Sequence, residues 1–379
     1  MKIGVIGAGT MGAGIAQIAA QNKNEIVLID NNENQLEIAI INIEKSLSKL
    51  TEKGKISEQE KVDIAHRVTR SIEFSDLKDC DLVIEAIVED INVKHSVFAA
   101  IEKNISRNCI IASNTSSLSI ASIGRVLEFP QRMIGIHFFN PATIMPLVEI
   151  IPGIQTEERI VDDAKRIISS WKKTVVLCKD TPGFIVNRVA RPFYGEALRI
   201  YDEGIADFAT IDWAMTELAQ FKMGPFTLMD YIGNDVNYAV TESVFNAFYY
   251  DPRFKPSFTQ KRLSEAGLLG RKTGKGYYDY SPEAVRCEPQ KDLELGNQIV
   301  ERILCMLINE AYDALMMKIA SKEDIELAMT KGVNYPKGLF EWAEEIGLNR
   351  VLKVLNNLFE DYGEDRYRPN ALLKKMSMK

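Results

Sequence analysis

The stretch "KIGVIGAGTMGAGIAQIAA" (residues 2–20) decides the fold of this chain. Its apolar run at residues 3–6 is typical of a buried parallel strand. Residues 7–12 follow with the pattern G-x-G-x-x-G, and the small residues after them are typical of a helix packed closely on a sheet. A lysine followed by apolar and small residues also resembles a secretory signal, but the run has no long uninterrupted apolar core. It also continues directly into a second strand at residues 25–29, so we interpret it as part of a βαβ unit.

Each glycine of this pattern has a mechanical role in binding a dinucleotide. Gly7 permits a tight turn, Gly9 lets a pyrophosphate approach the backbone, and Gly12 lets the helix pack against the strand. The N-terminus of the helix offers N–H groups and a partial positive charge to the phosphates. Asp30 ends the second strand, where it can hydrogen-bond a ribose 2′-hydroxyl and would repel a 2′-phosphate. The sequence therefore predicts a site for NAD rather than NADP.

Composition limits the classes of function. The 379 residues, 46% of them hydrophobic, suffice for two or three domains. The net charge of −7 argues against a general nucleic-acid or anionic-membrane binder, and no apolar run reaches the roughly 18 residues of a membrane span. Five cysteines without a C-x-x-C pair suit the reduced thiols of a cytoplasmic protein. With three histidines and no Cys/His cluster, we expect no metal site.

The first half of the chain alternates strands with helical patterns. Further β-rich apolar runs stand at residues 81–86, 110–114, 133–137, 147–151 and 174–178. We expect residues 31–70 to be helical, and Asp180-Thr181-Pro182-Gly183 to mark a domain boundary. The alternation predicts an α/β fold with a doubly wound, Rossmann-type sheet over residues 1–180.

The second half has an all-α pattern that repeats itself. Gly224-Pro225-Phe226 pairs with Gly338-Leu339-Phe340, and other similar stretches differ by the same 114 positions, so no gap is needed. We therefore predict two repeated helical modules, a first at residues 181–285 and a second, degenerate one at residues 297–379.

Several polar residues stand at predicted strand ends and could carry chemistry. His137 and Glu149 fall on neighbouring strands, where a carboxylate on one imidazole nitrogen would leave the other as a general base. The alternative is a core histidine satisfied by a structural acid. The hydroxyls of residues 113–117 could donate to a substrate or cap a helix, and Asn187 could face a cleft or cap a helix. A serine hydrolase is disfavoured because no G-x-S-x-G is present.

Seven motifs together identify a family resemblance. They are GAGTMGAGIA, VIEAIVEDINVK, SNTSSLSI, HFFNPATIMPLVEI, KDTPGFIVNR, GPFTLMDYIG and GRKTGKGYYDY. With them, and with the acid that ends the second strand, residues 1 to about 280 resemble the L-3-hydroxyacyl-CoA dehydrogenases, which include 3-hydroxybutyryl-CoA dehydrogenases. The resemblance implies that His137 is the general base and that Glu149 orients it. It also implies that Ser116 and Asn187 contact the reacting end of the substrate.

The same resemblance implies the ligands and the reaction. Residues that match NAD contacts are Gly7, Gly9, Gly12, Asp30, Glu89, Lys94, Asn140 and Lys272. Ser46 and Lys53 match positions that contact CoA. The implied activity is NAD-dependent oxidation of an (S)-3-hydroxyacyl-CoA to the 3-oxoacyl-CoA, and the reverse, in fatty-acid or butyrate metabolism. We expect a short-chain substrate such as 3-hydroxybutyryl-CoA.

One departure from the family pattern concerns the end of the chain. Single-module members end near GRKTGKGYYDY, and their helical modules are associated with dimerisation. The second module here lacks that segment and resembles the tandem modules of multifunctional fatty-acid oxidation enzymes. We expect residues 297–379 to fill the place of a dimer partner's module, giving either a monomer with an internal pseudo-dimer or a homo-oligomer through another surface. Two other functions stay open: a dehydrogenase of a free hydroxy acid or sugar acid, as in lambda-crystallin-type relatives, and a non-catalytic NAD-binding protein.

Overall fold

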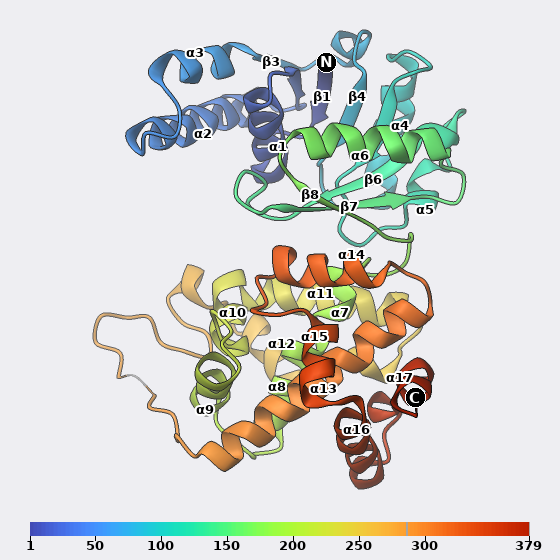
Figure 1. The fold of residues 1–379 in the computed structure, drawn as a ribbon. Coiled ribbons are helices and arrows are strands. Elements are labelled where there is room, and N and C mark those ends of the chain that lie inside the picture. Colours follow the sequence, from blue (N-terminus) through green and yellow to red (C-terminus); the bar gives the residue numbers. More distant parts are fainter. Residues whose placement is uncertain (286, 379) are drawn as a thin grey trace. The chain divides into compact units, whose positions relative to one another are not determined.

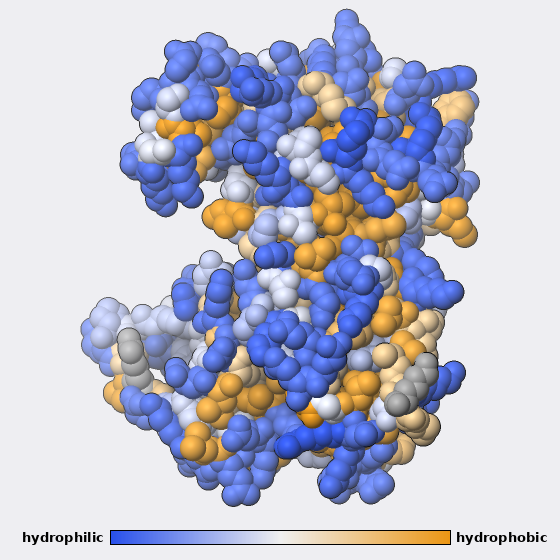
Figure 2. All heavy atoms as spheres, in the orientation of Figure 1, coloured by the Kyte–Doolittle hydropathy of each residue, from blue (hydrophilic) through white to orange (hydrophobic). Residues whose placement is uncertain are grey.

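The computed structural model describes residues 1–285 and 287–378. It divides into two compact units, Met1–Phe184 and Ile185–Lys379, each of which is described by itself (Figure 1). Hydrophilic residues cover most of the visible face of both units, as Figure 2 shows. No helix within the described residues combines the length and the apolar content needed to cross a bilayer.

The first unit contains an eight-stranded sheet with the order β3-β2-β1-β4-β5-β6-β7-β8. The strands are β1 (Lys2–Ile6), β2 (Glu25–Ile29), β3 (Val68–Ser71), β4 (Leu82–Glu85), β5 (Ile110–Ser113), β6 (Met133–Phe138), β7 (Leu147–Pro152) and β8 (Thr174–Leu177). Every neighbouring pair is parallel except β6 and β7. The strand order reverses between β1 and β4, which places the glycine-rich turn after β1 at the switch point where such sheets bind ligands.

Helices flank this sheet and bury its apolar strands. They are α1 (Thr10–Gln21), α2 (Glu33–Glu52), α3 (Glu58–His66), α4 (Ile91–Lys103), α5 (Ile120–Gly124) and α6 (Glu158–Ser170). The core joins β1, β2 and β4 to the small residues of α1 and to the apolar stripe of α2. The predicted doubly wound α/β fold, followed by an α-helical region, is confirmed.

The prediction that residues 31–70 are helical throughout is wrong at its end. Helix α3 ends at His66, and Val68–Ser71 form β3, the edge strand beside β2. The β-branched residues Val68 and Thr69 favour extended backbone, and pairing with β2 supplies the hydrogen bonds. Because β3 is only partly buried, it lacks the apolar run that marked the other strands.

The second unit is helical apart from isolated bridges at residues 270–279. Its helices are α7 (Val186–Val189), α8 (Arg191–Asp202), α9 (Phe208–Trp213), α10 (Pro225–Ile232), α11 (Asn234–Ala247), α12 (Phe258–Glu265), α13 (Leu293–Met316), α14 (Lys322–Leu327), α15 (Leu339–Ile346), α16 (Leu348–Tyr362) and α17 (Ala371–Ser377). The bounds of α9 and α10 recur 114 residues later in α14 and α15. A π-helical turn follows both α9 and α14, at residues 214–218 and 328–332.

The repeat extends to individual hydrogen bonds and ion pairs. Asp212 accepts the backbone N–H of Phe226 at 2.8 Å, and Glu326, 114 positions later, accepts that of Phe340 at 2.9 Å. In both copies a carboxylate therefore holds the N-terminus of the next helix, α10 or α15.

A second repeated feature is a pair of buried ion pairs that we call the exchanged pairs. Arg188 Nε lies 2.7 Å from Glu310 Oε1, and Arg302 Nε lies 3.0 Å from Glu196 Oε2. The two arginines differ by 114 positions, and so do the two glutamates. Each copy of the repeat thus binds the buried acid of the other, as in a two-fold symmetric interface.

Candidate active site

The glycine-rich turn forms a cradle for a pyrophosphate at the N-terminus of α1. Gly7 has φ +98°, and a Cβ there would lie 2.6 Å from the carbonyl oxygen of Ala86. A Cβ on Gly12 would lie 1.7 Å from the carbonyl oxygen of Gly7, so only glycine permits this packing of helix on strand. A Cβ on Gly9 would meet no protein atom within 4 Å, and the first turn of α1 has no side-chain cap. The open space and the uncapped N–H groups fit the phosphates of NAD.

Asp30 ends β2 beside this turn. Its Oδ2 accepts the backbone N–H of Ala8 at 2.8 Å, and its Oδ1 accepts that of Asn32 at 3.0 Å. The carboxylate thus ties the glycine-rich turn to the start of α2.

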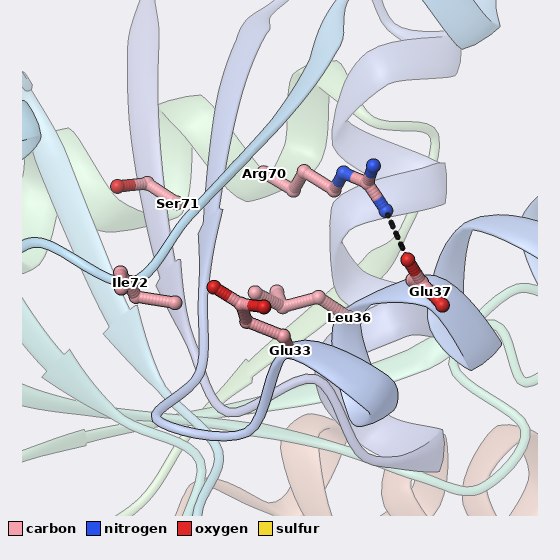
Figure 3. Close-up of a pocket in the computed structure, with 6 residues that line it drawn as sticks. All are labelled: Glu33, Leu36, Glu37, Arg70, Ser71 and Ile72. Atoms are coloured by element: carbon pink, nitrogen blue, oxygen red, sulfur yellow. Dashed lines mark ion pairs between the residues drawn. The ribbon is translucent and has the colours of Figure 1, made fainter.

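A pocket of about 360 Å³ lies at the carboxyl end of β3 and the start of α2 (Figure 3). It is lined by Glu33, Leu36, Glu37, Arg70, Ser71 and Ile72. Figure 3 shows Arg70 and Glu37 directed toward one another, with 3.6 Å between their charged atoms. The Ser71 carbonyl accepts the backbone N–H of Asp30 at 3.4 Å, so this pocket borders the acid that ends β2. Two glutamates in its lining make it unfavourable for a phosphate.

His137 and Glu149 form a buried pair on adjacent strands. Their backbones stand directly opposite in the antiparallel register of β6 and β7, and His137 Nδ1 lies 2.7 Å from Glu149 Oε2. Glu149 is fully buried and His137 is 6% exposed, with the ring of Phe139 centred 4.5 Å from the imidazole. Because the carboxylate occupies the Nδ1 side, the ring is oriented with Nε2 as the atom available for proton transfer.

Glu89 organises the loop that follows β5. Its Oε1 accepts the backbone N–H of Ser116 at 3.0 Å and the hydroxyl of Thr115 at 2.5 Å. Burial acts to raise the pKa of Glu89, but Lys94 and the hydrogen bonds from the loop outweigh it, so the pKa lies below its usual value. Glu89 therefore stays ionised and holds Ser116 in place.

Lys94 lies inside the protein rather than at its surface. Its side chain is 1% exposed, and its Nζ lies 2.6 Å from Glu85 Oε1 and 3.3 Å from Glu89 Oε2. Glu85 also accepts the hydroxyl of Ser113 at 2.6 Å. This network joins the ends of β4 and β5 to α4.

Two further residues hold the segment that follows His137. Asn114 Oδ1 accepts the backbone N–H of Phe138 at 2.8 Å. Lys173 donates from Nζ to the carbonyl oxygens of Ala142 and Met145, at 2.6 and 2.8 Å. Burial lowers the pKa of Lys173 to about 8. These contacts fix the loop in which Asn140 lies.

A groove of about 340 Å³ runs between this loop, the glycine-rich turn and α2. Pro141 and Thr143 line it on one side, and Ile38 and Asn42 of α2 line it on the other. Ser46 stands one helical turn beyond Asn42, and the exposed Lys53 directly follows α2 as its C-cap. Ser46 and Lys53 thus extend the face of α2 that borders the groove.

The remaining predicted residues lie in the second unit. Asn187 is a partly buried residue of α7. Lys272, in the short 3₁₀ turn at residues 271–273, forms an ion pair of 2.6 Å with Asp235 and is 44% exposed. Within the first unit the structure brings His137 to Glu149, and Glu89 to Lys94 and Ser116.

Three residues with a structural role at this site were missed in the sequence. Glu85 is an acid at the end of a buried parallel strand. The same pattern identified Asp30, so the sequence could have indicated Glu85 as well. Asn114 was considered only as part of the hydroxyl-rich stretch at residues 113–117, and no role of its own was predicted for it. Lys173 gives no signal, because its partners are carbonyl oxygens in a loop about 30 positions away.

Family models match nearly the whole chain. The model described as "3-hydroxyacyl-CoA dehydrogenase, NAD binding domain" matches residues 2–181. The model described as "3-hydroxyacyl-CoA dehydrogenase, C-terminal domain" matches twice, at residues 183–280 and 298–379.

Individual proteins show the same similarity. The chain is 35% identical to 3-hydroxyadipyl-CoA dehydrogenase of Escherichia coli over 99% of its own length and 97% of that protein. It is 39% identical to 3-hydroxybutyryl-CoA dehydrogenase of Clostridioides difficile, which it covers fully with 74% of its own length. The crystal structure of 3-hydroxybutyryl-CoA dehydrogenase from Escherichia coli K12 superposes with a TM-score of 0.93, at 34% identity, covering 100% of this chain and 98% of that one.

Proposed function

This chain belongs to the 3-hydroxyacyl-CoA dehydrogenase family, and from that premise we propose that His137 is the proton acceptor of the reaction and Glu149 its orienting partner. The family fixes the activity: the chain is an NAD-dependent oxidoreductase that interconverts a 3-hydroxyacyl-CoA and a 3-oxoacyl-CoA. The observation that carries the proposal is the 2.7 Å contact between His137 Nδ1 and the buried Glu149.

NAD supplies the chemistry of hydride transfer when it is bound at the glycine-rich turn. In oxidation, His137 Nε2 takes the proton of the substrate 3-hydroxyl, and the imidazolium that forms is stabilised by the carboxylate of Glu149. Ser116, held by Glu89, positions the substrate oxygen together with Asn187. In reduction, the protonated His137 returns the proton to that oxygen.

The NAD contacts follow from the cradle. Gly7, Gly9 and Gly12 admit the pyrophosphate, and Asp30 binds the adenosine ribose. The acidic pocket at the end of β3 then takes the adenosine side of NAD. Asn140 and Lys272 complete the contacts. Glu89 contacts the cofactor directly, whereas the buried Lys94 acts through Glu89.

The acyl-CoA enters along α2. Ser46 and Lys53 bind the CoA, and the groove beside Ile38 and Asn42 takes its pantetheine part. The substrate has the S configuration at C3 and a short acyl chain.

The test of this function is NADH formation from L-3-hydroxybutyryl-CoA by the wild type and by His137→Gln. We expect His137→Gln to lose about 100- to 10,000-fold in kcat, the range of general acid–base catalysis, while NAD binding is kept. A wild-type chain that binds NAD but oxidises no acyl-CoA would reject the function, in favour of a free hydroxy acid as substrate or of a non-catalytic role. Full activity of His137→Gln would reject only the assignment of the base.

The two copies of the helical repeat act as a pseudo-dimer within one chain. The exchanged pairs support this proposal, since each copy binds the other's buried acid. Residues 181–285 and 297–379 are then the two modules, after the NAD-binding domain of residues 1–180. We expect the chain to be a monomer, as size-exclusion chromatography with light scattering would show, and to reside in the cytoplasm, where its cysteines stay reduced.

A further inference from the structure

A pocket of about 170 Å³ lies in the second unit, between α8, the start of α12 and the segment before α17. Cationic side chains from three separate segments line it: Arg199 of α8, Lys255 before α12, and Arg366 in the 3₁₀ turn at Asp365–Tyr367. Gly195 of α8 also lines it, and a Cβ there would come no closer than 3.4 Å to a neighbouring atom. The pocket therefore combines unfilled space with positive charge.

The internal repeat gives this pocket a counterpart that the chain fills with its own side chains. In the second copy, Asn309 Oδ1 accepts the backbone N–H of Asn370 at 2.7 Å, and its Nδ2 donates to the carbonyl of Arg368 at 3.1 Å. Asp313 Oδ1 accepts the side-chain N–H of Asn370 at 2.8 Å, and its Oδ2 lies 3.0 Å from Arg253 Nη1. An amide and a carboxylate thus join α13 to the segment before α17 and to an arginine of the first copy.

The turns that carry the two arginines also correspond. Arg253 and Arg366 each form the middle of a three-residue 3₁₀ turn. Each turn leads through a proline to a helix that is capped by a side chain, α12 by Ser257 and α17 by Asn370. Arg366 is therefore the counterpart of Arg253, at an offset of 113 positions.

The first copy lacks both of the side chains that fill this place in the second. Gly195 stands 114 positions before Asn309, so the volume of the amide is left empty. Arg199 stands 114 positions before Asp313, so a cation replaces the carboxylate. Arg366 consequently lines a pocket together with another arginine, whereas its counterpart in the first copy binds an acid.

The cations of the pocket are incompletely satisfied by the chain. Arg199 Nη1 lies 2.6 Å from Glu196 Oε1, and Arg366 Nη2 lies 2.5 Å from Glu364 Oε1. Arg366 is nevertheless 8% exposed with an Nε that has no acceptor among the residues that the structure describes. Lys255 is exposed and takes part in no ion pair within the described part of the chain. Because a buried donor without an acceptor is unfavourable, the site calls for an acceptor from outside the chain.

The other charges around the pocket leave a positive balance. Asp202 lines it, but its carboxylate accepts the hydroxyls of Ser257 and Thr259, at 3.1 and 2.5 Å. The buried Arg191 stands behind the lining, where its Nη1 donates to the hydroxyl of Thr241 at 3.2 Å. Arg191 has no acidic partner among residues 1–285 and 287–378. Positive charge therefore exceeds negative charge at this place within the described residues.

We propose that this pocket binds a phosphate group, either as the free ion or as part of a small phosphorylated metabolite. The phosphate takes the place that the carboxylate of Asp313 holds in the second copy. The guanidinium forks of Arg199 and Arg366 match its oxygens, and Lys255 adds a point charge. A phosphate monoester has about two negative charges and three strong acceptor oxygens, which suits cations from three segments. Because Arg366 belongs to the second copy and the other two cations to the first, the bound group stabilises the contact between the copies.

The test measures phosphate binding to the chain saturated with NAD, so that the glycine-rich turn is occupied and cannot take the probe. Inorganic phosphate and glycerol 3-phosphate are titrated separately by calorimetry, at an ionic strength held constant with chloride, which distinguishes the free ion from an ester. We expect saturable binding of at least one of them. Arg366→Met should weaken it by about 10- to 150-fold, the range for a hydrogen bond to a charged group, and Arg366→Lys should restore part of it. A wild-type chain that binds neither probe saturably would overturn the inference.

Three further variants protect the test from misfolding and from general charge effects. Lys255→Met changes an exposed side chain and should weaken binding by about 3- to 10-fold. Gly195→Asn introduces the side chain that Asn309 provides in the second copy, and should abolish binding by filling the pocket. Arg350→Met removes a cation that is 68% exposed on α16 and should leave the affinity unchanged. An unchanged affinity in Lys255→Met or Gly195→Asn, or an equal loss in Arg350→Met, would overturn the inference.

Discussion

Replacing Glu149 by glutamine tests how much the buried carboxylate contributes to proton transfer. Glutamine has the same shape, so the packing around His137 is kept, but the imidazolium formed in the oxidation loses its charged acceptor at 2.7 Å. A hydrogen bond to a charged group contributes about 1.5–3 kcal/mol, which corresponds to a loss of about 10- to 150-fold in kcat. The Michaelis constants for NAD and acyl-CoA should change little, because the imidazole is neutral before the proton is transferred.

The assay is steady-state NADH formation from L-3-hydroxybutyryl-CoA, repeated with substrate deuterated at C3. A primary isotope effect on kcat establishes that the chemical step is being measured in both enzymes. The matched control is Glu158→Gln, which changes an exposed glutamate in the first turn of α6 and should retain wild-type rates. A kcat within about 3-fold of wild type for Glu149→Gln, with a full isotope effect, would refute the proposed role of the carboxylate.

Three other perturbations separate binding, titration and packing. Gly9→Ala should leave the melting temperature unchanged, because its Cβ would meet no protein atom, but it should weaken NAD binding at least about 10-fold, because that Cβ would fill the space of the pyrophosphate. Gly12→Ala should lower both the melting temperature and the affinity for NAD, since its Cβ would lie 1.7 Å from a carbonyl oxygen. A calorimetric titration with NAD and a thermal melt distinguish the two. For Lys173, whose pKa falls to about 8 against about 10.4 in an unfolded chain, the unfolded state holds more protons between these values. The free energy of unfolding of the wild type minus that of Lys173→Met should therefore rise from pH 7 to pH 10 in urea titrations, and a flat difference would contradict the assignment. Arg302→Met should destabilise the second unit by about 1.5–3 kcal/mol, because the buried Glu196 loses one of its two arginine partners and keeps only Arg199. The exposed Arg350→Met should cost less than about 1 kcal/mol by the same measurement.

The sequence predicted those features that depend on local pattern. The glycine spacing and Asp30 indicated the βαβ unit, and the offset of 114 positions indicated the repeat that recurs in the helix bounds. Strand β3 was missed because an edge strand needs neither an apolar run nor two neighbours, and only its pairing with β2 defines it.

The features of the site that were missed depend on distant partners. Because Lys94 matches a cofactor contact, its side chain would be expected at the surface of the binding site. Only the fold shows that it is buried between Glu85 and Glu89. An arginine in a helix is ordinary until its surroundings are known. Arg191 stands out only because, within residues 1–285 and 287–378, the buried Arg188 and Arg302 have acidic partners and Arg191 has none.

The exchanged pairs of Arg188 with Glu310 and Arg302 with Glu196 have a consequence for how the protein responds to dilution. Two separate chains joined by such contacts would come apart as their concentration falls, and their melting temperature would fall with it. Here both halves of the interface belong to one polypeptide, so the connecting segment keeps each half at a high effective concentration for the other. The contact between the two copies of the repeat is therefore part of the folding equilibrium of a single chain and does not depend on protein concentration. The enzyme can keep its fold at concentrations at which a dissociable dimer would separate.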